Sequence, residues 1–323
     1  MSASMVNHPV FSALLPVVLL IAIGLIAARA DWISAGATKD LSNLVFMVLT
    51  PALLFRAMST VQVQQLNFRP IALYFVAAGL LYALVFWLWG SSTRSAVLAL
   101  GATFSNTVMI GIALVGLAYG QAALVLLLTL ISVHALILLT AATIVLELTR
   151  AREQIGTAAQ APAASGAWHT VWAALKGGVV HPVPLPILLG LLFAQTGLVL
   201  PEVLDRPLQL LGSAFGPMAL LLVGASLARV AIGAQWRAAL VLAALKNLAL
   251  PLLVAGLGRL WGLNGLDWTV MVLAAALPMG ANVFLFAQRY QVAQDLVTAS
   301  MALSTALGLV SITLVMAGLD WLA

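Results

Sequence analysis

The chain of 323 residues is 63% hydrophobic and 7% charged, with a mean hydropathy of +1.14 and a formal net charge of +5. Such a composition excludes a soluble globular domain, in which charged residues make up about a quarter of the chain. Because the chain has no cysteine, disulfides, thiol catalysis and cysteine metal sites are excluded as well.

Apolar stretches long enough to cross a bilayer, which takes about 20 residues, follow one another along the whole chain. Ten are assigned: Val10–Ala28, Leu41–Met58, Pro70–Trp89, Val97–Tyr119, Ala122–Leu146, Pro182–Leu200, Leu208–Val230, Trp236–Leu257, Thr269–Ala287 and Leu296–Leu319. The connections are short, so the sequence predicts an all-α integral membrane protein with ten transmembrane helices. The first stretch is interpreted as a span and not as a secretory signal, because it is longer than a signal's apolar region and follows no basic residue.

The longest connection contains a run of small residues, Thr157 to Gly166, that is typical of a linker. It divides the chain into a first repeat of five spans (1–148), a linker (149–177) and a second repeat of five spans (178–323). Since each half has an odd number of spans, two like halves must insert in opposite orientations. This is the inverted-repeat plan of many transporters.

The distribution of lysine and arginine predicts the orientation, because cytoplasmic loops carry an excess of both. The loops after odd-numbered spans carry Arg29, Lys39, Arg94, Arg150, Arg152, Lys176, Arg229, Arg237 and Arg289, and the loops after even-numbered spans carry Arg56, Arg69, Arg206 and Arg259. We therefore expect a multi-pass protein of the cell membrane, with the linker in the cytoplasm and both termini outside it.

The fourth and ninth stretches are both expected to break near their middles. In the fourth, Ser105, Asn106 and Thr107 form a polar cluster at a depth where each unsatisfied polar group costs several kcal/mol, and Gly111 follows.

In the ninth stretch, Pro278 removes a backbone donor and clashes with the preceding turn, Gly280 weakens the helix further, and Asn282 follows. Helices interrupted at mid-depth in corresponding places of two halves indicate a transporter's binding site.

Asn106 and Asn282 are the central candidates for that site. If the two antiparallel helices cross at their breaks, half-helix N-termini with partial positive charge meet there and attract anions. Asparagine can donate and accept hydrogen bonds, which suits a carboxylate. The alternative is that both residues only cap the broken helices or bond across a helix interface.

Two ionisable residues lie within predicted spans. Lys246 is ten residues into the eighth stretch, about 15 Å by helical rise, and is expected either to neutralise half-helix carbonyls at the crossing or to hold the anion. His134, in the fifth stretch, either takes part in proton coupling or is a hydrogen-bonded structural residue.

The nine acidic residues all lie at span ends or in connections, which argues against a proton antiporter that uses embedded carboxylates. No GxSxG, HExxH or P-loop pattern is present, so we expect no enzyme, no cofactor and no metal site.

Taken together, these features resemble the auxin efflux carrier family, which includes plant PIN-type carriers and bacterial malate or malonate permeases. The segments that carry the resemblance cover nearly the whole chain: Leu41–Phe55, Asn106–Gly111, Pro217–Leu227, Lys246 with Pro251, and Pro278–Tyr290. The resemblance implies two inverted five-helix repeats with broken crossover helices 4 and 9, as in the sodium/bile-acid symporters. It also implies a scaffold of spans 1, 2, 6 and 7, with the other spans forming a moving transport domain.

The family's crossover asparagines correspond to Asn106 and Asn282. Its proline two residues after the first crossover glycine is replaced here by Ala113, so the first break must rest on the polar cluster and Gly111.

We expect a secondary transporter of small organic anions that works by alternating access. Its substrates would be mono- or dicarboxylates such as malate and malonate, or auxin-like weak acids. The predicted substrate-binding residues are Ser105, Asn106, Thr107, Gly111, Lys246, Pro278, Gly280 and Asn282. The alternatives are a sodium- or proton-coupled symporter of another small metabolite, and a membrane-embedded channel or sensor. The expected partners are the substrate and the lipid bilayer, with no nucleic acid; Na⁺ or H⁺ coupling and a homodimer are left open.

Overall fold

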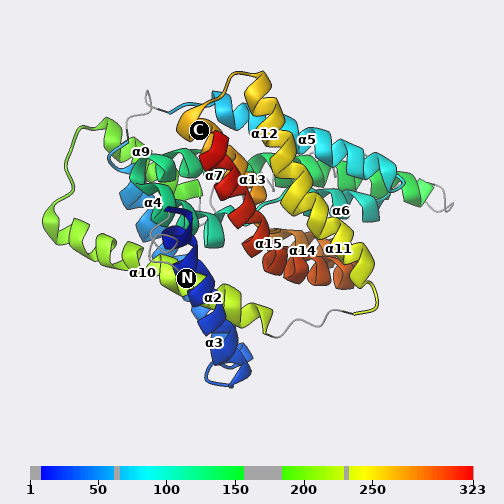
Figure 1. Ribbon diagram of the computed structural model, residues 1–323, viewed down its shortest axis with the longest axis horizontal. Coiled ribbons are helices and arrows are strands. Elements are labelled where there is room, and N and C mark those ends of the chain that lie inside the picture. Colours follow the sequence, from blue (N-terminus) through cyan, green and yellow to red (C-terminus); the bar gives the residue numbers. More distant parts are fainter. Residues whose placement is uncertain (1–8, 62–65, 156–183, 229–232, 323) are drawn as a thin grey trace.

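The computed structural model of the protein describes residues 9–61, 66–155, 184–228 and 233–322, and every element within these ranges is helical (Figure 1). The all-α prediction is therefore confirmed for the described part of the chain. The predicted linker run Thr157–Gly166 and the terminal residues 1–8 and 323 lie outside the described residues.

The helices follow one another in chain order, and η marks a π-helical segment. The first half contains α2 (Pro9–Arg29), α3 (Ala35–Leu44), η1 (Val45–Leu49), α4 (Thr50–Met58), α5 (Arg69–Leu88), α6 (Thr93–Thr103), η3 (Thr107–Gly111) and α7 (Ile112–Ile155). The second half contains α9 (Pro184–Gln195), α10 (Glu202–Leu227), α11 (Trp236–Ala244), η4 (Leu245–Ala249), α12 (Leu250–Leu260), α13 (Gly265–Ala276), α14 (Asn282–Tyr290) and α15 (Gln294–Leu322).

Six helical stretches in the described part are long and apolar enough to cross a membrane: Ala35–Met58, Arg69–Leu88, Thr107–Arg150, Glu202–Leu227, Trp236–Leu260 and Gln294–Gly318. Shorter apolar helices occupy Leu15–Arg29, Leu185–Gln195 and Gly265–Ala276. Helices therefore occur where spans were predicted. The number of ten spans and the inverted repeat remain predictions.

One residue inside α7, Gly120, has non-helical dihedral angles, φ 72° and ψ −162°. Glycine reaches this region without the clash that a Cβ atom would cause. It separates the fourth predicted stretch from the fifth, so the long helix of Figure 1 consists of two helical segments joined at this residue. Because α7 continues to Ile155, residues 149–155 of the predicted linker are helical.

The two π-helical segments η1 and η4 each lie just before a proline, Pro51 and Pro251. Proline has no N–H and its ring displaces the preceding turn. In η1 the hydrogen bond into this turn runs from the Thr50 N–H to the Val45 carbonyl, five residues back, and the Thr50 hydroxyl donates to the same carbonyl at 2.8 Å. Such bulges are frequent at functional sites because they redirect side chains.

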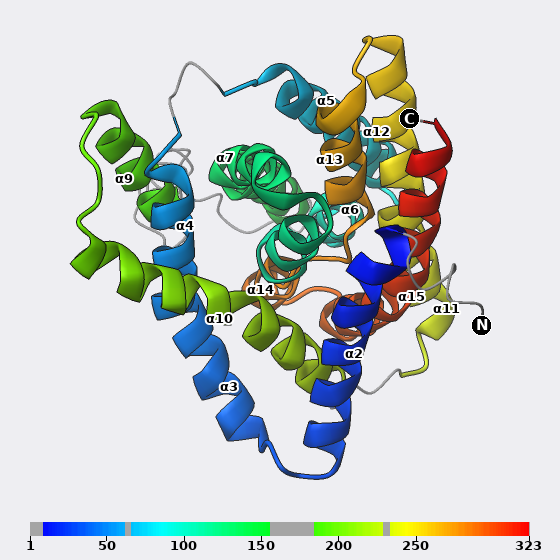
Figure 2. The same cartoon turned by 60° about the vertical axis from the view of Figure 1, so that its left-hand side comes forward.

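The helices surround a buried apolar core, and α7 runs through the middle of the molecule (Figure 2). On one side, α2 packs along α10, and α4 packs against α9 and α10. The α2–α10 contact is close because Gly24 faces the backbone of Leu221 while Gly224 faces that of Ile21, where a Cβ atom has no room.

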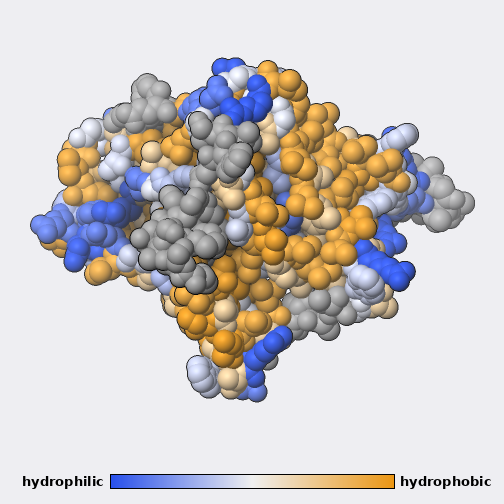
Figure 3. Space-filling model, in the orientation of Figure 1, coloured by the Kyte–Doolittle hydropathy of each residue, from blue (hydrophilic) through white to orange (hydrophobic). Residues whose placement is uncertain are grey.

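The outer surface is largely hydrophobic, and hydrophilic residues gather toward the edges of the view in Figure 3. Leu252 is 71% exposed and Leu314 is 64% exposed. A soluble protein of this size rarely exposes so much contiguous apolar surface. The surface therefore suits contact with lipid.

Candidate functional site

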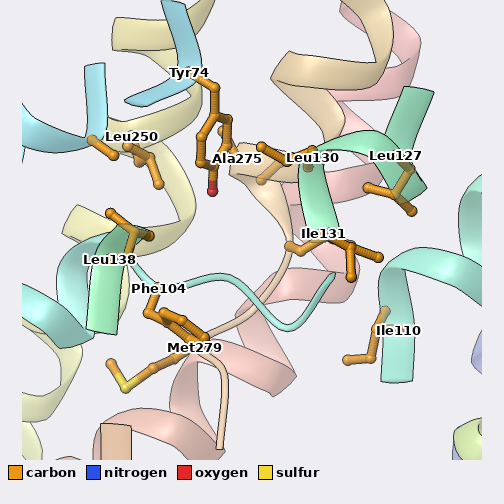
Figure 4. Close-up of a cluster of buried hydrophobic side chains, with 14 of the residues drawn as sticks. Tyr74, Phe104, Ile110, Leu127, Leu130, Ile131, Leu138, Leu250, Ala275 and Met279 are labelled. Carbon is orange, nitrogen blue, oxygen red and sulfur yellow. The ribbon is translucent and has the colours of Figure 1, made fainter. Parts of the chain in front are cut away.

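The fourth and ninth predicted stretches are both interrupted, as expected. The helix α6 ends at Thr103, and residues 104–106 lead in extended and irregular conformation into η3 and α7. The helix α13 ends at Ala276, and residues 277–281 lead into α14. The two interrupted segments pass each other in Figure 4, with Phe104 and Met279 beside one another.

The two breaks are joined by backbone hydrogen bonds. The Asn106 N–H donates to the Pro278 carbonyl at 2.8 Å, and the Gly280 N–H donates to the Phe104 carbonyl at 2.9 Å. Ser105 and Met279 thereby form an isolated antiparallel bridge. Broken backbone at membrane depth is tolerated only where protein satisfies its polar groups or it lines a wet cavity. Here each break supplies the other with partners, so the two segments cross as one unit, which we call the crossing.

Two glycines allow this close approach. A Cβ atom on Gly280 would lie 2.6 Å from the Phe104 ring and 3.1 Å from the Ser105 carbonyl oxygen. A Cβ atom on Gly111 would lie 2.7 Å from a methyl group of Leu277. Both glycines were predicted to belong to the site, and the structure shows that they provide space between its two segments.

Lys246 lies beside the crossing and is fully buried. Its ammonium group donates to the carbonyl oxygens of Ala275 and Leu277, both at 2.7 Å. These carbonyls lie at the C-terminal end of α13, where a helix carries partial negative charge and leaves carbonyls without partners. Lys246 was predicted either to neutralise half-helix carbonyls or to hold the anion. Its contacts in the structure are with half-helix carbonyls.

The residue after Lys246, Asn247, also helps to hold the second break, although it was not among the predicted site residues. Asn247 donates from Nδ2 to the Ser304 carbonyl at 2.8 Å and accepts from the Ser304 hydroxyl at 2.6 Å. The Ser304 hydroxyl also accepts from the Met279 N–H of the second break at 2.9 Å. All these groups are buried. A second polar side chain next to a mid-span lysine was a signal that could have identified Asn247.

The two crossover asparagines stand at the starts of the second half-helices. Asn106 precedes η3, and its side-chain oxygen accepts from the Met109 N–H at 3.2 Å, so it caps that segment. Asn282 is the first residue of α14, and its amide makes no hydrogen bond to any residue that the structure describes. Both side chains are half-buried. The structure thus places two helix N-termini at the crossing and leaves the Asn282 amide available.

The remaining predicted site residues contribute differently. Ser105 is 1% exposed, and its hydroxyl is hydrogen-bonded to the Tyr74 hydroxyl at 3.0 Å, which in turn lies 3.3 Å from His134 Nε2. His134 therefore has a hydrogen-bonding partner, and its ring packs on Phe104 with 4.6 Å between centroids. Thr107 is buried at the start of η3. Ser105 thus takes part in a buried chain of hydrogen bonds behind the crossing.

Acidic side chains are absent from the sequence of both breaks, residues 104–106 and 277–281. No group of three or more histidine, aspartate or glutamate residues that could hold a metal ion occurs in the part of the chain that the structure describes. Helix N-termini and amide side chains do lie at the crossing, and groups of this kind can bind an anion.

A family model described as membrane transport protein matches residues 9–316, which is nearly the whole chain. No match was found among curated proteins.

Proposed function

The chain belongs to the auxin efflux carrier family of membrane transport proteins, and from this premise we propose that it carries small organic anions across the cell membrane by alternating access. The observation that carries the proposal is the crossing, where two interrupted helices bring half-helix N-termini and the Asn282 amide together. Transporters of this general plan bind their substrates near mid-depth between such broken helices.

The chemistry of the crossing supports a carboxylate as the substrate. Helix N-termini attract negative charge, and an amide can donate to a carboxylate oxygen. Lys246 adds a positive charge to the same region, and no acidic residue belongs to either break. Mono- and dicarboxylates such as malate and malonate, or auxin-like weak acids, fit this environment.

The way the helices pack supports a division into two moving parts. Spans 1, 2, 6 and 7 correspond to α2, α3–α4, α9 and α10. Within this set, α10 packs on α2 and α4, and α4 also packs on α9. The crossing lies in the other set, with α6, α7, α13 and α14. We propose that the first set is the scaffold and that the second moves the site from one side of the membrane to the other.

The test is uptake of radiolabelled malonate and a panel of other carboxylates by the full-length protein reconstituted in liposomes, with and without a sodium or proton gradient. We expect saturable uptake. Asn282→Ala should weaken affinity by roughly 5- to 150-fold, because a partner left unpaired in a desolvated site costs about 1–3 kcal/mol. Asn282→Asp should be worse, since it adds a like charge beside the anion.

Asn264→Ala is the matched control, because among the described residues the side chain of this exposed asparagine bonds only to Arg259 near the end of α12 and to Gly262 in the loop before α13. It should transport normally. Uptake of a neutral metabolite with no carboxylate uptake would overturn the proposal and favour a symporter of another solute. Normal binding by Asn282→Asp would show that this residue is not a ligand.

A further inference from the structure

A cavity of about 730 Å³ lies between α4, α7, α9 and α10, and none of its lining residues belongs to the crossing. Small-molecule sites commonly have volumes of about 300–1,000 Å³. Arg56 and Asp205 line the cavity together with neutral polar side chains, among them Thr60, Gln121 and Gln209. The cavity is therefore large enough and polar enough for a small organic anion.

The charged groups of the cavity are held to each other. Arg56 Nε donates to Asp205 Oδ1 at 2.7 Å, and Nη2 donates to Oδ2 at 3.0 Å. This two-pronged geometry is the one with which a guanidinium recognises any carboxylate. The two side chains are 38% and 33% exposed, and an ion pair as exposed as this one is weak. A second carboxylate in the cavity can therefore compete with Asp205 for Arg56.

Asp205 has a favourable place to stay once it is displaced. It lies in the first turn of α10, where the helix dipole stabilises negative charge. Pro201, which precedes the helix, provides no side-chain cap there. After the exchange, the substrate carboxylate is paired with Arg56, and the displaced Asp205 carboxylate remains near the positive end of the α10 dipole.

The walls of the cavity continue toward the crossing. The helix α7 lines the cavity at Leu124, and Leu127, one turn further, lies beside Gly111 at the end of η3, which follows the first break. The helix α10 lines it at Gly212, and one turn further it packs against the start of α7. Along each wall, about one helical turn, or roughly 5.4 Å, therefore separates the cavity from the helical residues that follow the first break, Gly111 and Ala113.

We propose that this cavity is a second site for the transported carboxylate, in which the substrate replaces Asp205 on the Arg56 guanidinium before it reaches the crossing. The proposal rests on the proposed function, because it takes the substrate to be a carboxylate. It assigns Arg56 as a binding residue and Asp205 as an internal competitor that occupies the empty site.

Equilibrium binding of radiolabelled malonate to the purified full-length protein tests this assignment. The Asn282→Ala variant is used as the background, because it should weaken malonate binding at the crossing and leave binding in the cavity. In this background, Arg56→Gln should lower the remaining malonate affinity by roughly 10- to 150-fold, as expected for loss of a charge-assisted pair. Asp205→Asn should tighten it several-fold, because the competitor loses its charge. Since this variant gains binding, its result does not depend on whether Arg56→Gln folds.

Arg206→Gln is the matched control. Arg206 lies next to Asp205 and does not itself line the cavity, although it donates to Gln209, which does, so its removal changes the local charge equally while the Arg56–Asp205 pair stays in place. Unchanged malonate binding in Arg56→Gln, or weaker binding in Asp205→Asn, would overturn the proposal. Uptake by the wild-type protein distinguishes failure of the cavity proposal from failure of the proposed function. If the wild-type protein takes up carboxylates but the Asn282→Ala variant shows no remaining malonate binding, only the cavity proposal is refuted. If the wild-type protein takes up no carboxylate, the proposed function is refuted.

Discussion

At the scale of single residues, Lys246 shows how a charge is kept at mid-depth without an acidic partner. Its ammonium group lies within 2.7 Å of two carbonyl oxygens at the end of α13. The carbonyls gain the donors that the ended helix no longer supplies, and the charge gains partners in place of water. The residue thus stabilises the second break and places positive charge beside the crossing.

Replacing Lys246 by alanine should abolish transport and lower the melting temperature of the purified protein. The carbonyls of Ala275 and Leu277 would lose their donor, which costs about 1–3 kcal/mol for each. Lys246→Arg should keep a fraction of the transport, because a guanidinium can still donate but is larger than the site. Uptake assays and thermal unfolding measure both effects.

The control is Lys39→Ala, which removes an exposed lysine from α3. It should leave the melting temperature and the transport rate unchanged. If Lys246→Ala transports at the wild-type rate at normal expression, Lys246 neither stabilises the crossing nor takes part in the site.

At the scale of helices, the crossing is held in place by its neighbours as well as by its own backbone bonds. The π-helical segment η4 presents Lys246 and Asn247 to α13 and α15, and α15 presents Ser304 to the second break. Because buried polar groups are costly when unpaired, such a network fixes one arrangement of the helices. The Ser304 hydroxyl therefore ties the second break to α15.

Ser304→Ala should destabilise the protein by about 1–3 kcal/mol and reduce transport, because Asn247 and the Met279 N–H each lose a partner. Ser300→Ala is the matched control. Ser300 is equally buried on α15, but among the described residues its hydroxyl donates only to the Leu296 carbonyl of its own helix, at 2.6 Å. Thermal unfolding and uptake should separate the two variants, and equal losses in both would show that the link to the crossing is unimportant.

At the scale of the whole molecule, the helices form a membrane protein whose surface in the view of Figure 3 is largely apolar, and two regions with polar groups bear on the proposed transport. One region is the crossing, and the other is the cavity with Arg56 and Asp205. A transporter that alternates between two states needs polar groups on the substrate's path and apolar surface everywhere else, because lipid cannot satisfy them.

The orientation in the membrane is predicted from the excess of basic residues in the loops after odd-numbered spans, nine against four. A reporter inserted within Thr157–Gly166 should be active in the cytoplasm. A reporter fused after Ala323 should be active only outside it. Cytoplasmic activity of the C-terminal fusion would reverse the orientation.

The sequence by itself determined where helices form, where two of them break, and which polar residues stand at the breaks. These features follow from apolar length and from proline, glycine and asparagine, whose effects are local. Only the tertiary structure showed that Lys246 bonds to carbonyls 29 and 31 residues away, and that Ser304 joins Asn247 to the second break. It alone also showed that Ser105 bonds to Tyr74 and that Arg56 meets Asp205 across 149 residues. Partners so far apart in sequence are set by how the helices pack, and an apolar stretch specifies that a helix forms there but not which neighbour it meets.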